Sequence, residues 1–143
     1  LTLMRELAHG IYPPLLRDRG LTEALRTAAN RSILPTTVEA TDLGRYDPEV
    51  EAAVYFCCLE AMQNADKHAG GDATVRVGVK DHGGQLAFEV RDDGPGFDAA
   101  QASGRGSGFV NMADRLGAFG GTLEVTSSPG GGTSVQGQVP VAG

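Results

Sequence analysis

Residues 74–91 carry the clearest fold signal in the chain: Thr-Val-Arg-Val-Gly-Val-Lys-Asp-His-Gly-Gly-Gln-Leu-Ala-Phe-Glu-Val-Arg. Apolar and polar side chains alternate on both sides of a His-Gly-Gly turn, which predicts a β-hairpin. The apolar positions are Val75, Val77 and Val79, followed by Leu86, Phe88 and Val90. Strands that alternate so regularly bury one face only, and other elements must cover that face.

Helical patterns flank this hairpin. Residues 48–69 have a helical period, with Pro48 at the first position, where its missing N–H costs nothing. Residues 21–33 predict a shorter helix, residues 36–40 a short strand, and the glycines of 104–108 precede a third helix. Two further segments near the C-terminal end, in which apolar and polar residues alternate, are also predicted to be strands. The expected fold class is therefore α/β (α+β): a two-layer sandwich with a mixed, mostly antiparallel sheet of about five strands, covered on one face by three helices.

Composition restricts the possible functions. The chain has 143 residues, 41% hydrophobic and 21% charged, which fits one domain with a substantial core. Its net charge of −6 argues against nucleic-acid binding, and no stripe of Lys and Arg indicates direct membrane contact. No apolar run is long enough to cross a membrane, so we expect a cytoplasmic chain, whether or not its parent is membrane-anchored. The adjacent Cys57 and Cys58 are expected to stay unpaired.

The long predicted helix carries the first candidate motif, Glu-Ala-Met-Gln-Asn-Ala-Asp-Lys-His at 60–68. Glu60, Asn64 and His68 are spaced by four residues and line one stripe of the helix, beside an apolar stripe. A side-chain amide at the rim of a pocket suits a hydrated Mg²⁺, and Lys67 adds a cation for phosphates. A solvated helix face explains the same stretch equally well.

The second motif is Asp-Asp-Gly-Pro-Gly-Phe at 92–97, directly after the second strand of the hairpin. The carboxylate of Asp92 at a strand end can accept a hydrogen bond from an exocyclic amine such as that of adenine. Gly94 and Gly96 let the backbone turn away from the base. The alternative is a plain Asp-Gly turn.

The third motif is Gly-Arg-Gly-Ser-Gly-Phe at 104–109, where a helix is predicted to begin. Free backbone N–H groups and the helix dipole there suit a triphosphate. It is not a Walker loop, because no Gly-Lys-Ser/Thr follows, and it comes after a long loop instead of a strand.

In this order, the three motifs closely resemble the boxes of the GHKL family, the Bergerat-type ATP-binding fold shared by gyrase, Hsp90 and histidine kinases. A fourth box, Gly-Thr on a closing strand, matches Gly132 and Thr133. The resemblance implies that the domain binds ATP and Mg²⁺. It also implies that Asn64 binds Mg²⁺, that Asp92 recognises adenine, and that Thr133 assists adenine recognition through a water molecule.

The resemblance implies further roles. Lys67 and His68 approach the phosphates, and Glu60 organises a magnesium-bound water, with a general-base role as the second possibility. The glycines that shape the pocket and its lid (97–107) are Gly94, Gly96, Gly104, Gly106 and Gly108.

The sequences that flank the ATP-binding motifs resemble those of histidine kinases whose response regulators use a helix-turn-helix output. Residues 7–25 look like the junction after the dimerisation helices, and 108–115 look like that subfamily's Gly-Leu-x-x-Met-x-x-Arg pattern, with Phe109 in place of leucine. We therefore expect the end of a dimerisation helix and a linker at 1–18, and the ATP-binding catalytic domain at 19–143. His9 lacks the acidic neighbour of an acceptor histidine, and His82 reads as a surface residue.

The expected activity is transfer of the ATP γ-phosphoryl group to a histidine on the protein's own dimerisation and phosphotransfer segment, with a response regulator downstream. The fragment alone is expected to be a monomer without transfer activity, and its parent a homodimer. A non-catalytic nucleotide-sensing or partner-binding module is the main alternative. A gyrase-type ATPase and an anti-sigma serine kinase fit less well, because the chain lacks a transducer domain and carries the 1–19 junction.

Overall fold

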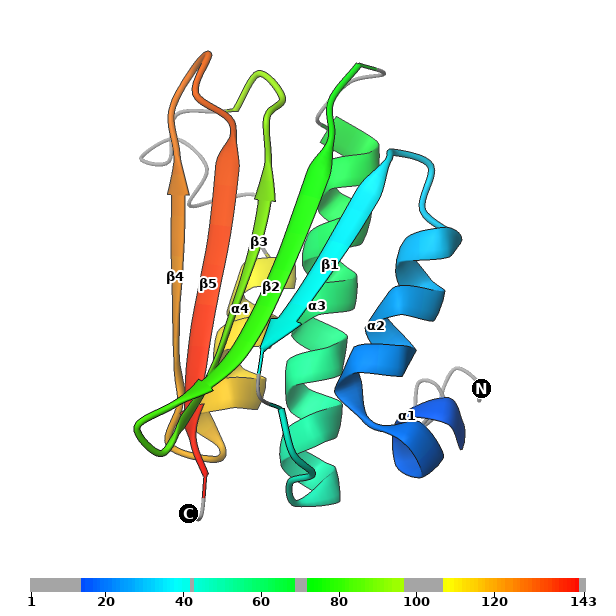
Figure 1. Cartoon of the computed structure of the whole chain (residues 1–143). Helices are drawn as coiled ribbons and strands as arrows, with labels where there is room; N and C mark the ends of the chain where they lie inside the picture. Colours follow the sequence, from blue (N-terminus) through cyan, green and yellow to red (C-terminus); the bar gives the residue numbers. More distant parts are fainter. Residues whose placement is uncertain (1–13, 42, 69–71, 97–106, 142–143) are drawn as a thin grey trace, which may run out of the picture.

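The computed structural model describes residues 14–41, 43–68, 72–96 and 107–141. They form two layers, a five-stranded sheet and helices on one of its faces (Figure 1). The helices are α1 (Pro14–Arg19), α2 (Leu21–Asn30), α3 (Pro48–His68) and α4 (Ser107–Gly117). The strands are β1 (Thr36–Thr41), β2 (Val75–His82), β3 (Gln85–Asp92), β4 (Thr122–Ser127) and β5 (Thr133–Pro140).

The sheet has the order β1-β2-β3-β5-β4. β1 runs parallel to β2, and the other three pairs are antiparallel, so the predicted mixed, mostly antiparallel sheet is confirmed. The predicted hairpin is β2–β3, closed by Gly83 and Gly84, whose φ angles are 60° and 82°. Two consecutive positive φ angles are typical of the tight turn whose twist matches paired strands.

The core lies between the sheet and α3, the longest helix. The inward-facing side chains of β2 and β3 are buried, as the alternation predicts: Val75, Val77, Val79, Leu86, Phe88 and Val90. α3 contributes Val54, Ala61 and Ala65, together with Cys57 and Cys58, which are both free and fully buried. Burial raises the pKa of the Cys57 thiol to about 12, so this side chain packs as a small apolar group.

Three helices, α2, α3 and α4, cover the sheet face as expected, and the described residues form one further helix, α1, which packs against α2 and α3. The Pro-Pro pair at 13–14 predicts a helix stop, but α1 begins at Pro14, because proline is well tolerated in the first turn of a helix. Leu16 of α1 is fully buried in the same core as α2 and α3. The helix at residues 14–19 is therefore packed onto the rest of the described structure. Among the described helices, none has both the length and the apolar character to cross a membrane.

Candidate functional site

A row of polar side chains crosses three strands at one end of the sheet. Asp92 ends β3 and is the partner of Thr133 at the start of β5, while Thr133 is also the partner of Ser127 at the end of β4. The next inward-facing pair along β3 and β5 is Val90 and Val135, and both are buried. Since side chains two residues apart point to the same face of a strand, the polar row faces the helix layer.

The two adjacent aspartates have different partners. Asp93 is exposed and accepts two hydrogen bonds from Thr74, from the backbone N–H at 2.6 Å and from Oγ1 at 3.0 Å. These hydrogen bonds lower the pKa of Asp93, the backbone one most, and they hold the start of β2 against the end of β3. Asp92 is half-buried, and among the described residues only the N–H of Gly94 donates to it, to Oδ1 at 2.9 Å. Asp92 therefore keeps acceptor capacity for a ligand.

The second sequence motif, at residues 92–97, packs tightly through Gly96 against the turn between β4 and β5. Gly96 has a φ of 67°, and a Cβ there would overlap the carbonyl oxygen of Ser128. Gly130 N–H donates to the Pro95 carbonyl at 2.6 Å. Gly132, with a φ of 76°, lies so close to Asp92 that a Cβ would overlap the Asp92 carbonyl oxygen. Only glycine fits Gly96 and Gly132, and the structure thus joins the second and fourth sequence motifs.

The predicted stripe on α3 lies beside the core. Glu60 and Asn64 are half-buried and flank the buried Ala61 and Ala65, whereas Lys67 is exposed. α3 ends at the same end of the molecule as the Asp92–Thr133–Ser127 row (Figure 1). His68 is the last residue of α3, and its side chain lies outside the described part of the structure.

The third motif is described only in part. α4 begins at Ser107, so the predicted helix begins within the motif and Gly108 is its second residue. Gly104 and Gly106, like the predicted lid up to residue 106, lie outside the described residues. His9 lies outside them too, and His82 is exposed at the end of β2, as expected.

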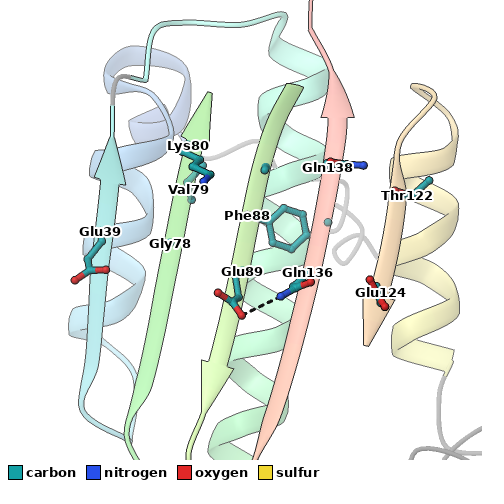
Figure 2. A pocket seen from close by; sticks show the side chains of 12 residues that line it. Glu39, Gly78, Val79, Lys80, Phe88, Glu89, Thr122, Glu124, Gln136 and Gln138 are labelled. Atoms are coloured by element: carbon teal, nitrogen blue, oxygen red, sulfur yellow. Dashed lines mark hydrogen bonds between the residues drawn. The ribbon is translucent and has the colours of Figure 1, made fainter. Parts of the chain in front are cut away.

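A groove of about 530 Å³ crosses the opposite, open face of the sheet (Figure 2). Its lining includes Glu39, Glu89 and Glu124, with Lys80 as a cation, and contains none of the predicted site residues. Three carboxylates disfavour a triphosphate by charge repulsion. The groove is therefore not the predicted nucleotide site, which lies on the helix-covered face.

The sequence reading missed Ser127. Its Oγ lies 2.9 Å from Thr133 Oγ1 and 2.9 Å from the Gly132 carbonyl oxygen. A signal existed in the alternation of β4, which places Ser127 on the inward face after Leu123 and Val125. The identity of its partners depends on the β4–β5 register and is not visible in the sequence.

A mixed sheet covered by helices on one face, with an acceptor row at the sheet end beside a Glu-Asn stripe, defines an α/β sandwich suited to nucleotides. The profile of the histidine kinase-, DNA gyrase B- and HSP90-like ATPases matches residues 49–143. This is more than half of the chain, so the chain belongs to that ATP-binding family, and the predicted family is confirmed.

Relatives of the chain are sensor histidine kinases. The chain is 34% identical over 138 residues to the sensor histidine kinase MctS of Rhizobium johnstonii, an alignment covering 91% of this chain and 30% of MctS. It is 31% identical over 147 residues to the sensor histidine kinase LiaS of Bacillus subtilis, covering 96% and 39% respectively. The chain thus spans about a third of the length of these relatives.

Solved histidine kinases share the fold. The blue-light activated histidine kinase of Erythrobacter litoralis superposes with a TM-score of 0.73 at 22% identity, over 85% of this chain and 42% of that one. The catalytic domain of the histidine kinase ThkA superposes with a TM-score of 0.63 at 15% identity, over 84% and 91%. The predicted two-layer fold is that of histidine kinase catalytic domains.

Proposed function

We propose that this domain binds Mg-ATP between its sheet and α3 and donates the γ-phosphoryl group to a histidine on a separate dimerisation segment. The observation that carries the proposal is the half-buried Asp92, which keeps acceptor capacity in one row with Thr133. Membership of the ATP-binding family and the similarity to sensor histidine kinases support it.

Each site residue has a proposed task. Asp92 accepts from the exocyclic amine of adenine, with Thr133 beside it in the row. The tight packing of Gly96 against the β4–β5 turn fixes the backbone that follows Asp92. For the phosphate end of the nucleotide, the family resemblance assigns phosphate contacts to Lys67 and His68 and to the glycine motif that contains Gly104, Gly106 and Gly108.

Asn64 fits a magnesium site. Mg²⁺ keeps most of its waters and needs only one or two protein oxygens beside the phosphates, and the half-buried amide of Asn64 offers one. A bound Mg²⁺ would neutralise phosphate charge. Glu60, one turn earlier on α3, can accept hydrogen bonds from water at the same place, so we assign it to ordering water and not to hydrolysis.

The transfer itself requires a partner segment. The acceptor nitrogen forms a bond to the γ-phosphorus while the bond to the bridging oxygen breaks, and ADP leaves. The domain contributes positioning and charge neutralisation. We propose that residues 1–18 form the junction to that segment, with α1 as the part packed on the domain through Leu16. A response regulator of the helix-turn-helix class is the proposed next acceptor, in the cytoplasm, where ATP is available.

A trans-transfer assay tests this function. The domain is incubated with radioactive ATP and Mg²⁺, alone and with a separate dimerisation segment that carries a histidine followed by an acid. We expect an acid-labile phosphohistidine on the added segment only, and no labelling of the domain by itself. Asp92→Asn should suppress the labelling.

Two outcomes would contradict the proposal. Nucleotide binding without transfer to any such segment would favour the alternative, a nucleotide-sensing or partner-binding module. Stoichiometric self-labelling of the domain, abolished by His9→Gln, would make His9 the acceptor.

A further inference from the structure

The side chain of Ser127, at the end of β4, contacts both Gly132 and Thr133. Its Oγ lies 2.9 Å from the carbonyl oxygen of Gly132 and 2.9 Å from Oγ1 of Thr133. Both contacts close the turn that returns the chain from β4 to β5. Thr133 is the residue that stands beside Asp92 in the polar row.

The direction of each hydrogen bond follows from the number of hydrogens that each group can donate. A carbonyl oxygen only accepts, so Ser127 donates its single hydroxyl hydrogen to Gly132. Ser127 therefore has no hydrogen left for Thr133, and in the second contact Thr133 donates to Ser127. Among the described residues, Thr133 Oγ1 has no other hydrogen-bond partner. With its hydrogen directed at Ser127, Thr133 presents only lone pairs to the rest of its surroundings.

The row then offers a ligand two acceptors side by side. The Asp92 carboxylate is an acceptor by charge, and Thr133 becomes one through Ser127. The two residues are direct partners across β3 and β5, where facing Cβ atoms lie about 4.5–5.5 Å apart. An amino group with two hydrogens matches two acceptors at this separation, directly or through one water. An oxo group at the same position faces only lone pairs and is rejected.

We propose that Ser127 is a positioning residue for base selection: it fixes the hydroxyl hydrogen of Thr133 and so makes the sheet end accept an amino purine and reject an oxo purine. The inference rests on the proposed nucleotide site and adds to it a residue that contacts the base only through Thr133.

The test compares ATP with inosine triphosphate, which carries an oxo group in place of the 6-amino group. Dissociation constants for both are measured by calorimetry with Mg²⁺ for the unmutated protein and for Ser127→Ala. In Ser127→Ala the Thr133 hydroxyl is released and can turn its hydrogen toward the oxo group. We expect the dissociation constant of inosine triphosphate, divided by that of ATP, to fall by roughly three- to tenfold in Ser127→Ala. This change corresponds to the free energy of one hydrogen bond.

Three matched variants isolate the effect. Ser127→Thr retains the hydroxyl and should retain the ratio. Thr126→Ala, on the exposed face of the same strand, should change nothing. In a Thr133→Val background, Ser127→Ala should no longer change the ratio, because the hydroxyl that Ser127 directs is gone.

A purely structural role for Ser127 gives a different result. If Ser127→Ala weakens both nucleotides equally and leaves their ratio unchanged, this inference is wrong while the proposed function stands. If the unmutated protein binds neither nucleotide, the proposed function fails, and this inference with it.

Discussion

The guanidinium of Arg45 donates to both carboxylate oxygens of Glu51, from Nε at 3.0 Å and from Nη2 at 3.2 Å. Glu51 is fully buried in the first turn of α3 and accepts a third hydrogen bond from the Tyr46 N–H at 3.1 Å. Arg45 Nη2 also donates to the carbonyls of Leu16 and Arg17 in α1, at 3.3 and 2.7 Å. One side chain thus compensates a buried charge and links α1 to α3.

Arg45→Met is expected to destabilise the domain strongly. The substitution leaves the Glu51 carboxylate buried, and among the described residues the Tyr46 N–H, at 3.1 Å, is its remaining hydrogen-bond donor. An uncompensated buried charge costs about 3–5 kcal/mol, and because the Arg45 side chain is 50% exposed, water can replace part of the lost contact. We expect a loss of about 2–4 kcal/mol in the free energy of unfolding, measured by urea denaturation.

Arg26→Met is the matched control. Arg26 and Glu23 form an exposed pair on α2 with a 3.7 Å separation, which should contribute less than about 1 kcal/mol. Equal destabilisation by the two substitutions would show that the Arg45–Glu51 pair is no more important than a surface pair.

Asp92→Asn should weaken adenine nucleotides selectively. The amide removes the charge that strengthens the hydrogen bond to the base amine, while its remaining carbonyl oxygen can still accept from Gly94. Losing one charge-assisted hydrogen bond costs about 1.5–3 kcal/mol, or roughly tenfold to a hundredfold in affinity. Calorimetric titration with ATP and GTP measures the effect.

Asp93→Asn provides the comparison for the Asp92 variant. Asp93 binds Thr74 at the start of β2, so its substitution should affect the stability of the sheet end and leave base preference unchanged. Equal affinity of the unmutated protein for ATP and GTP would exclude the adenine assignment.

Asn64→Ala and Glu60→Gln should separate metal binding from proton chemistry. The two half-buried side chains lie one turn apart on α3. Removing the Asn64 amide should abolish the Mg²⁺ dependence of ATP binding, because few protein oxygens hold this ion. Glu60→Gln keeps the shape and should leave nucleotide affinity nearly intact. Full Mg²⁺ dependence in Asn64→Ala, seen in titrations with and without the metal, would mean that the metal site lies elsewhere.

Local patterns predicted most of the fold. Alternation predicted β2 and β3, because the register of a half-buried hairpin is specified by its own side chains. α1 was missed because its helix is supported by Leu16 in the core and by Arg45, contacts that join segments 28 and 29 residues apart.

The residues of the candidate site could be named from sequence motifs, whereas their spatial arrangement could not. The resemblance named both Asp92 and Thr133, but their direct pairing depends on the β3–β5 register. The hydroxyl of Ser127 gave no signal of its own, because a serine at a strand end is ordinary. Its proposed effect on Thr133 follows only from which carbonyl lies within hydrogen-bond distance.

Glu89 should make stability depend on pH. Its carboxylate accepts from Gln136 Nε2 at 3.1 Å and from Ser134 Oγ at 2.8 Å on β5 (Figure 2 shows the first contact). These hydrogen bonds, with Gln136 first, lower the pKa of Glu89 below its ordinary value of 4.5. A lowered folded-state pKa stabilises the fold above the unfolded-state pKa, and this contribution is lost as the pH falls through the folded-state pKa.

Glu89→Gln keeps the shape and removes the titrating group. We expect the variant to be less stable than the unmutated protein by about 0.5–1 kcal/mol at pH 7, where only the charge assistance of the two bonds is lost. The difference should shrink below about pH 4.5 as Glu89 in the unmutated protein takes up its proton. Urea denaturation at pH 7, 5 and 3.5 measures it. Ser134→Ala removes one hydrogen-bond donor to Glu89 and should also reduce the pH dependence of stability. If the stability difference between Glu89→Gln and the unmutated protein is the same at all three pH values, the assignment is wrong.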